Sequence, residues 1–296
     1  MVIESNRRLP ALIAIVGATG TGKSALAVAL AKQFGGEIIS ADSRQVYRDL
    51  NIGTGKLTKH EMRGLPHHLL DVTSLRRTYT AQQYQRTAQR VIKKVWRRGK
   101  LPILCGGTGL YVNAVLNGTV FPEVPPNRTL RSELKKKKIE ELFTLLKKKD
   151  PRRAREIDRH NPRRLIRALE IVEAQGKVPA ARAKPIEART LIIGLALPTE
   201  TLERRTRARI QSWLRRGLLR ETVDVPQRHI SELGLVYRWA LRFARNEIPR
   251  AAFIEGLTHN LLAYAKRQQR WFERDPRVIW VAHKREALLL AKRFLK

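Results

Sequence analysis

The 296-residue chain has a single cysteine, few acidic residues and no long apolar segment. Because Cys105 has no second cysteine to pair with, an intramolecular disulfide is excluded, which is typical of the reducing cytoplasm. No segment approaches the roughly 20 apolar residues of a membrane-spanning helix. The apolar run 9–16 follows Arg7 and Arg8 as in a signal peptide, but it is short and leads straight into a glycine-rich loop. We therefore interpret it as a buried strand and expect a cytoplasmic protein that does not enter a membrane.

The shortage of acidic residues leaves a large positive charge. The chain has 26 Asp and Glu against 60 Lys and Arg, a net charge of +34 and a sequence pI near 11.3. Such an excess repels itself unless an anionic partner neutralises it, so we predict a nucleic-acid partner. One alternative is a basic surface that serves only solubility. The other is an anionic membrane, but the sequence shows neither a basic amphipathic anchor helix nor a lipidation signal at a terminus.

Apolar segments alternate with amphipathic ones along the first third of the chain. The sequence predicts strands at 11–16, 37–40, 101–105, 190–196 and 278–281, and helices at 25–34, 82–98, 202–218, 251–272 and the C-terminus. This succession predicts an α/β fold, with a P-loop parallel sheet core, right-handed crossovers and flanking helices. Ligands in this architecture bind at the carboxyl ends of the strands.

The chain changes character near Phe121, where three prolines introduce a charged helical stretch. Asn161 followed by Pro162 is typical of a helix start within this stretch. We predict a P-loop catalytic core formed by residues 1–120 and 190–296, and a basic helical insertion at 121–189 that contacts RNA. Its lysine runs could also be solvated helix faces.

The strongest local signal is GATGTGKS at 17–24, which fits the phosphate-binding pattern GxxxxGK[ST] between a strand and a helix. The glycines let successive backbone N–H groups surround phosphate oxygens. Lys23 adds a positive charge, and the Ser24 hydroxyl can ligate Mg²⁺. The alternative is a purely structural glycine-rich turn.

Phosphate binding alone does not imply ATP hydrolysis. A typical nucleotidase has an aspartate after an apolar strand, whereas the predicted strand 101–105 is followed by Gly106-Gly107-Thr108. The acidic residue at the tip of an early strand is Asp42. It is a candidate general base or metal ligand, and the alternative is a turn or helix-capping residue.

Seven motifs span nearly the whole chain. They are GATGTGKS (17–24), ISADSRQVY (39–47), NIGTGK (51–56), GLPHHLLDV (64–72), LPILCGGTGLY (101–111), RRLIRALE (163–170) and YAKRQQRWF (264–272). In this combination and order the sequence resembles the tRNA dimethylallyltransferases, also called isopentenyl-tRNA transferases.

The resemblance implies transfer of a dimethylallyl group from dimethylallyl diphosphate to N6 of the adenosine 3′-adjacent to the anticodon, with release of diphosphate. The implied cofactor is Mg²⁺ and the implied partner is the tRNA anticodon stem-loop; we expect a monomer. In that family the P-loop holds the donor's diphosphate. The general base falls on Asp42, and the threonine that points at the bridging oxygen falls on Thr108.

The resemblance also implies a set of site residues. Those implied as catalytic are Asp42, Thr108 and Arg209. Those implied to bind diphosphate are Gly17, Ala18, Thr19, Gly20, Thr21, Gly22, Lys23, Ser24, Arg164 and Arg209, with Ser24 on the metal. Those expected to contact tRNA are Asp42, Ser43, Arg44, Gln45, Thr108, Arg131, Arg163, Arg164, Leu165, Ile166, Arg167, Arg238, Lys266 and Arg267.

These residue types suit the chemistry. The exocyclic amine of adenine is a weak nucleophile, so its attack on an allylic carbon needs a proton acceptor and cations that stabilise the leaving diphosphate. The target base is stacked in the anticodon loop and must be flipped out to react. The segment 264–271 mixes aromatic and cationic residues, as RNA-stacking surfaces do, although Tyr264 and Trp271 could equally belong to a core.

The sequence departs from the usual family pattern at three places. Leu261-Leu262 replaces a Thr-Arg pair, Val236 replaces the glycine of Gly-Tyr-Arg, and 51–57 differs from Asp-Ile-Gly-Thr-Ala-Lys-Pro. These changes leave the donor site intact and concern tRNA contacts.

Three other functions fit parts of the sequence. A P-loop kinase lacks the expected carboxylate after strand 101–105, and a non-enzymatic RNA-binding protein gives no role to the P-loop with Asp42 and Thr108. Prenylation of free adenine nucleotides shares the chemistry, but the basic insertion favours tRNA. We do not expect zinc at His67 and His68, because adjacent strand residues point to opposite faces.

Overall fold

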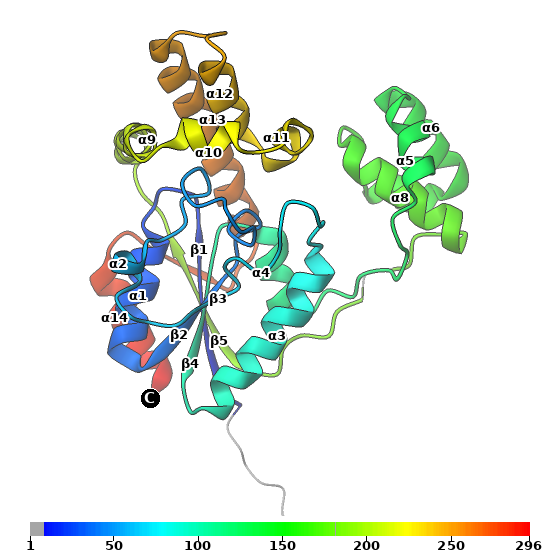
Figure 1. Cartoon of the computed structure of the whole chain (residues 1–296). Coiled ribbons are helices and arrows are strands. Elements are labelled where there is room, and N and C mark those ends of the chain that lie inside the picture. Colours follow the sequence, from blue (N-terminus) through cyan, green and yellow to red (C-terminus); the bar gives the residue numbers. More distant parts are fainter. Residues whose placement is uncertain (1–8, 181) are drawn as a thin grey trace, which may run out of the picture. The chain divides into compact units, whose positions relative to one another are not determined.

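The computed structural model describes residues 9–180 and 182–296 (Figure 1). The chain divides into two compact units, Met1–Gly118 with Pro185–Lys296, and Thr119–Lys184. We call the first the sheet unit and the second the helical unit. No helix in the described ranges is long and apolar enough to cross a membrane.

The sheet unit is built on six strands. They are β1 (Ala11–Gly17), β2 (Gly36–Ser40), β3 (His67–His68), β4 (Leu101–Cys105), β5 (Arg189–Leu195) and β6 (Val278–Val281). Their order is β3-β2-β4-β1-β5-β6, and every neighbouring pair is parallel. This confirms the predicted α/β fold with a parallel core. Because the strands are parallel, their carboxyl ends share one edge, where the loops after β1, β2 and β4 meet.

Helices cover both faces of this sheet, which is why β1 is apolar at almost every position. Leu12, Ala14 and Val16 belong to one core cluster, and Ile13 and Ile15 to another. The first cluster is completed by α3 (Ala81–Arg97) and α4 (Gly109–Leu116), and the second by α1 (Lys23–Phe34) and α14 (Lys284–Leu295), as Figure 1 shows. Alternate side chains of one strand therefore fix helices on opposite sides.

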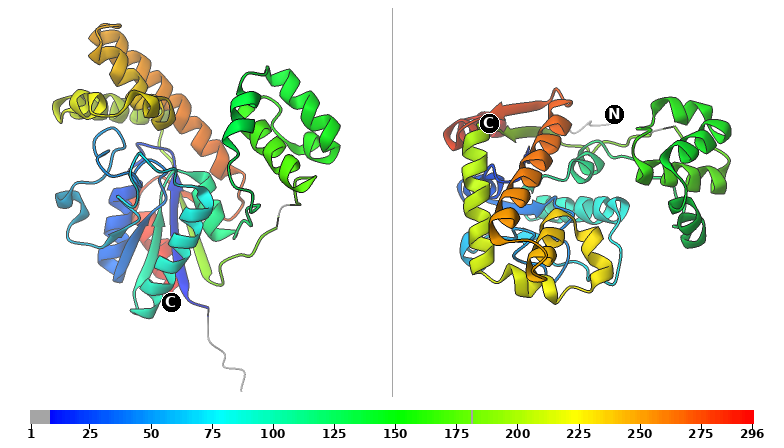
Figure 2. Two further views of the ribbon diagram at one scale, coloured as in Figure 1. Left: turned by 45° about the vertical axis from the view of Figure 1, so that its right-hand side comes forward. Right: turned by 90° about the horizontal axis from the view of Figure 1, so that it is seen from above.

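The sheet unit also carries a group of helices at its carboxyl edge. They are α9 (Thr199–Arg215), α10 (Leu218–Val223), α11 (Gln227–Leu233), α12 (Leu235–Ala244) and α13 (Arg250–Glu273); the short α2 (Lys59–Met62) precedes β3. The expected helix 202–218 is wrong at its end, because the chain turns at Gly217 with φ +93° and starts α10. Helices α9 and α13 pack side by side (Figure 2), around Ile210, Trp213 and Phe253.

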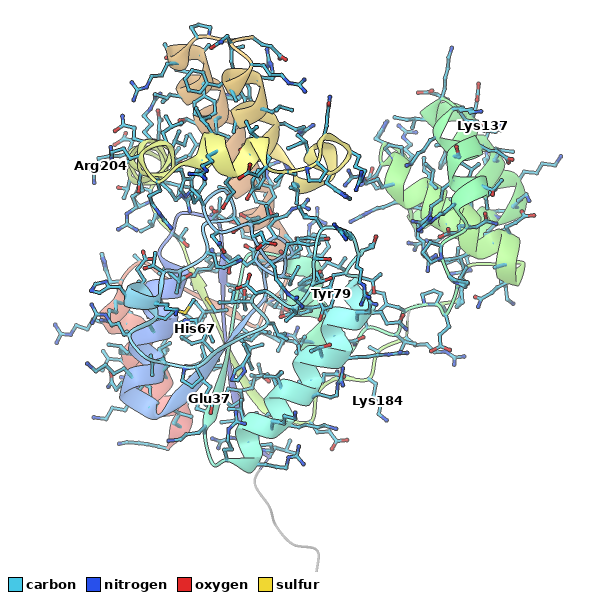
Figure 3. All side chains as sticks on the ribbon, viewed as in Figure 1. Glu37, His67, Tyr79, Lys137, Lys184 and Arg204 are labelled. Carbon is cyan, nitrogen blue, oxygen red and sulfur yellow. The ribbon has the colours of Figure 1, made fainter. Side chains whose placement is uncertain are left out.

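The helical unit contains α5 (Arg128–Lys135), α6 (Ile139–Lys149), α7 (Pro151–Glu156) and α8 (Pro162–Gln175) around its own apolar core. Asn161 caps α8 as expected, since its Oδ1 accepts from the Arg164 amide at 3.2 Å. The lysines at 135–138 and 147–149 are all exposed, including Lys137 in Figure 3. The unit ends at Lys184 rather than 189, because Arg189 already pairs with Ala11 in the sheet.

A buried carboxylate, Glu170, joins several segments of the helical unit. Glu170 of α8, 1% exposed, accepts two hydrogen bonds from Arg131 at 2.7 Å each, one from the Asn127 amide at 2.7 Å and one from Arg167. Burial alone would raise the pKa of Glu170, but these hydrogen bonds outweigh it and hold the pKa below the usual 4.5. A carboxyl whose pKa is lowered by folding contributes stability above its unfolded pKa and loses it as the pH falls through the folded value.

We predict that Glu170→Gln destabilises the helical unit at pH 7 by about 3 kcal/mol, because it removes one member of a buried ion pair. Glu170 provides part of the loss of stability in acid, below its usual pKa of 4.5, and the variant should lack that part. Hydrogen exchange of α8 peptides at pH 7 and in acid measures both effects within this unit.

Glu173→Gln, on the same helix, is the matched control, because its pair with Lys149 is exposed. Such surface pairs contribute little to stability. Equal exchange rates in the two variants would contradict the central role of Glu170.

Candidate active site

The phosphate-binding loop lies between β1 and α1, as its sequence predicts. Gly17, Gly20 and Gly22 all have positive φ, from +89° to +131°, a region that side chains rarely adopt. Helix α1 begins directly after this loop at Lys23, so its free N–H groups and the positive end of its dipole face the carboxyl edge of the sheet. This is the geometry of an anion-binding site.

Lys23 is held inside the loop. Its Nζ donates to the Ala18 carbonyl at 2.5 Å. Burial lowers the pKa of Lys23 to about 8, against the opposing effects of Cys105 and Asp42. The amine is therefore cationic near neutral pH but close to its titration point.

The loops after β2 and β4 are joined to each other. The Ala41 amide donates to the Cys105 carbonyl at 2.8 Å, and the Thr108 amide donates back to the Ala41 carbonyl at 3.1 Å. The Ser43 amide donates to the Thr108 hydroxyl at 3.0 Å. A Cβ at Gly106 would lie 2.1 Å from the Ala41 carbonyl oxygen, so no side chain fits there. This contact places Asp42 and Thr108 next to each other, where a nucleotidase would have a carboxylate after the strand.

Asp42 has a structural and a potential chemical role at once. Its Oδ1 accepts from the Arg44 amide at 2.8 Å, which is the turn geometry considered from the sequence. Within residues 9–180 and 182–296, no donor reaches its second oxygen, and the side chain is half-buried. One carboxylate oxygen is thus fixed while the other can accept a proton.

Side chains from distant helices hold the phosphate loop. Gln268 of α13 accepts from the Thr19 amide at 2.8 Å and donates to the Gly107 carbonyl at 2.7 Å, so it ties the loop to the segment that precedes Thr108. Arg205 of α9 donates to the Thr21 carbonyl at 3.2 Å. Sequence reasoning assigned no role to Gln268 or Arg205.

Arg209 lies against the same loop, as expected. Its Nη2 donates to the Thr19 hydroxyl at 3.3 Å, and its guanidinium stacks over Trp213. Burial lowers the pKa of Arg209 from its ordinary value. Its Nε is buried and finds no hydrogen-bond partner in the described part of the chain. A buried guanidinium with an unused donor beside a phosphate loop is suited to bind an anion.

The residues expected to contact RNA differ in how exposed their side chains are. Those with exposed side chains are Arg163, Arg164, Arg238, Lys266 and Arg267, and Ser43, Arg44 and Gln45 are half-buried beside Asp42. Leu165 and Ile166, 0% and 9% exposed, belong to the core of the helical unit. The expected contact between these two side chains and RNA is therefore wrong. The helical spacing of the sequence already puts Leu165 on a different face from Arg164 and Arg167. The contact with RNA was implied by the resemblance, which covers the stretch 163–167 as a whole.

Three arginines of the helical unit have distinct environments. Arg131 and Arg167 bind Glu170, so any contact with RNA would compete with that ion pair. Arg164 is exposed on α8. Its expected contact with the donor's diphosphate stays a prediction.

The two aromatic residues of the 264–271 segment differ. Tyr264 is 37% exposed, with the Arg267 guanidinium 5.9 Å from its ring centre. Trp271 packs against Gly109 and the sheet core. Tyr264 therefore remains a candidate for stacking on a base, whereas Trp271 is a packing residue.

The histidine pair of the sequence lies on β3 (Figure 3). His68 bonds to Glu37 at 2.6 Å, and His67 bonds to the Leu65 carbonyl at 2.9 Å. Glu37 also accepts from Arg98. These contacts fasten the edge of the sheet.

The unusual positions are apolar packing sites. Leu261 and Val236 are buried in the core formed by α9, α12 and α13, and Leu262 packs beside Ala265. The replacement of polar residues by leucine there is compatible with close packing.

A parallel sheet with a phosphate loop after β1 and a carboxylate after β2 defines a P-loop protein whose site can act on a phosphorylated substrate. A model of the IPP transferase family matches residues 45–275. A tRNA dimethylallyltransferase of Roseiflexus sp. is 40% identical over 280 residues, which cover 90% of this chain and 92% of the relative. The enzyme of that name from Pelotomaculum thermopropionicum is 37% identical over 94% of this chain and 92% of its own length. The chain therefore belongs to the IPP transferase family.

Solved structures agree. A tRNA isopentenylpyrophosphate transferase from Bacillus halodurans has a TM-score of 0.70 and 33% identity, with 96% of this chain and 95% of that chain covered. A eukaryotic dimethylallyltransferase described as acting on tRNA has a TM-score of 0.78 and 25% identity, with 97% and 79% covered.

We predict that the contribution of Lys23 to pyrophosphate binding disappears as the pH rises through about 8, because the amine then loses its proton. Calorimetric titration of the wild type and Lys23→Met between pH 7 and 10 measures this contribution as the ratio of the two affinities. Ionisation of pyrophosphate itself affects both proteins equally. A ratio that stays constant over this range would refute the titration of Lys23.

Gln268→Ala should weaken pyrophosphate binding about tenfold, since it leaves the Thr19 amide and the Gly107 carbonyl without their partner and loosens the loop. The same calorimetric titration at one pH tests this. Gln269→Ala is the control, because that side chain donates to Glu273 on the exposed side of α13 and lies outside the phosphate loop. Equal affinities of the two variants would show that Gln268 is not needed.

Proposed function

We propose that the protein transfers a dimethylallyl group from dimethylallyl diphosphate to N6 of the adenosine 3′-adjacent to the anticodon of tRNA, releasing diphosphate. The observation that carries this proposal is the junction of three loops at one sheet edge. It places an anion-binding loop, a half-exposed carboxylate and a threonine hydroxyl next to each other. Membership of the IPP transferase family supports the choice of substrates.

The phosphate loop binds the leaving group. The N–H groups at the start of α1, the Lys23 amine and the buried Arg209 guanidinium all present positive charge to a diphosphate. Negative charge grows on the diphosphate as the allylic C–O bond breaks, so donors that are already in place stabilise the transition state more than the ground state. In this proposal the Thr108 hydroxyl, which in the structure donates to the Ser43 hydroxyl at 3.4 Å, turns to donate to the bridging oxygen.

Asp42 activates the acceptor. The N6 amine of a flipped adenine attacks the allylic carbon, and its proton passes to the Asp42 oxygen that the Arg44 amide leaves open. The bond to the amide keeps the carboxylate oriented during this transfer. Atoms balance without a further reactant, since the products are prenylated adenosine, diphosphate and one proton.

We propose that Mg²⁺ binds here mainly through the diphosphate of dimethylallyl diphosphate. The ion prefers oxygen ligands and commonly bridges substrate phosphates with one or two protein ligands. Ser24, at the first turn of α1, offers such an oxygen next to the phosphate loop. When bound, the ion would neutralise charge on the diphosphate.

The helical unit supplies positive charge for the RNA. It contains 19 Lys and Arg against 9 Asp and Glu, and its lysine runs are exposed. Such charges bind phosphates without reading sequence, whereas the flipped base is recognised in the site. We propose that the protein acts as a monomer.

Incubation of the protein with unmodified tRNA, Mg²⁺ and dimethylallyl diphosphate tests the function. Mass spectrometry of the digested RNA should show one prenylated adenosine beside the anticodon. Free adenosine monophosphate replaces tRNA in a parallel reaction and should give no product. ATP hydrolysis without prenylated RNA would favour a kinase instead.

Asp42→Ala should lower the single-turnover rate by about 10² to 10⁴, the usual range for loss of a general base. Asp42→Asn is the sharper test, because its carbonyl can still accept from the Arg44 amide but cannot take a proton. We expect this variant to keep wild-type thermal stability and to lose the rate. A wild-type rate in Asp42→Asn would rule out proton transfer to Asp42.

A further inference from the structure

A second anion-binding geometry lies in the loop after Asp42, and a side chain fills it. The consecutive amides of Asn51, Ile52 and Gly53 all donate to the carboxylate of Glu221, at 2.7, 2.8 and 2.8 Å. Successive N–H groups that converge in this way form a nest, the arrangement that elsewhere binds phosphate. Here the anion comes from α10, 168 to 170 residues further along the chain.

The Glu221 carboxylate accepts a fourth hydrogen bond. The Tyr237 hydroxyl of α12 donates to Glu221 Oε1 at 2.8 Å. Burial raises the pKa of Tyr237, and the charge of Glu221 raises it further, so the phenol remains a donor. Its ring packs on Gly53, where a Cβ would lie 2.7 Å from ring carbon Cζ. Helices α10 and α12 therefore hold loop 51–53 through the carboxylate of Glu221.

This loop is connected to the segment that begins with Asp42. The Gln45 side-chain amide donates to the carbonyls of Thr54 and Gly55, at 3.4 and 3.3 Å. The buried Lys56 amine donates to the Tyr47 carbonyl at 3.0 Å. In the described ranges no hydrogen bond joins loop 51–55 to the phosphate loop 17–24. The hydrogen bonds that continue from the loop held by Glu221 thus lead to the acceptor side of the site.

We propose that Glu221 is a positioning residue for the RNA acceptor: by filling the nest at 51–53 it fixes the loop that orients Gln45 and, through it, the 42–45 segment. This inference rests on the proposed function, since it assigns the 42–45 segment to the acceptor. In this proposal Gln268 holds the loop that binds the donor, and Glu221 holds the loop that orients the acceptor.

Glu221→Gln tests the inference, because it keeps the shape but removes the charge and turns a donor toward the amides. We expect kcat/KM for tRNA and the affinity for tRNA to fall on the order of tenfold or more, as for lost charge-assisted hydrogen bonds. The Kd for inorganic pyrophosphate should stay within about twofold of wild type, since no hydrogen bond joins this loop to the phosphate loop. Tyr237→Phe, which keeps the carboxylate and its three amides, should show the same pattern more weakly.

Glu203→Gln is the matched control, because it makes the same charge change on α9 in an exposed pair with Arg207. A merely structural role would lower the folded fraction and affect tRNA and pyrophosphate binding in parallel, which would overturn the proposal. Wild-type behaviour toward tRNA in a folded Glu221→Gln protein would overturn it as well. If the wild type forms no prenylated RNA, the proposed function fails. The affinity of Glu221→Gln for tRNA, compared with that of Glu203→Gln, then decides whether Glu221 orients an RNA-binding loop.

Discussion

The close approach of the backbones after β2 and β4 is the constraint on which the site depends. Gly106 touches the Ala41 carbonyl so closely that no side chain can intervene. Reciprocal hydrogen bonds between these strand ends then place Asp42 and Thr108 together beside the phosphate loop. A parallel sheet provides the shared edge, but this contact decides which side chains meet there.

The sequence predicted those parts of the molecule that depend on local patterns. The apolar runs of β1, β4 and β6 mark strands, and the glycine pattern of 17–24 marks the phosphate loop, because each signal lies within a few neighbouring residues. The break at Gly217 was missed. It depends on how the chain packs at a distance, which a short pattern does not carry.

The supporting residues of the site were missed for the same physical reason. Gln268 and the Thr19 amide it binds are 249 residues apart, and Glu221 and Asn51 are 170 apart. A glutamine or glutamate on a helix has no local feature that names such a partner. The resemblance at 163–167 misled in the opposite direction, because it assigned a continuous stretch to RNA that includes Leu165 and Ile166, whose side chains are buried.

The carboxylate in the 51–53 nest has a consequence for selectivity. A chain with a net charge of +34 attracts every nearby polyanion. If the nest at 51–53 were empty, its amides would compete with the phosphate loop for diphosphate. They would also bind a phosphate of the RNA and hold it in the wrong position. Glu221 prevents this competition, because its carboxylate already accepts from all three amides. Strong general attraction and discrimination between two anions can then coexist on one surface.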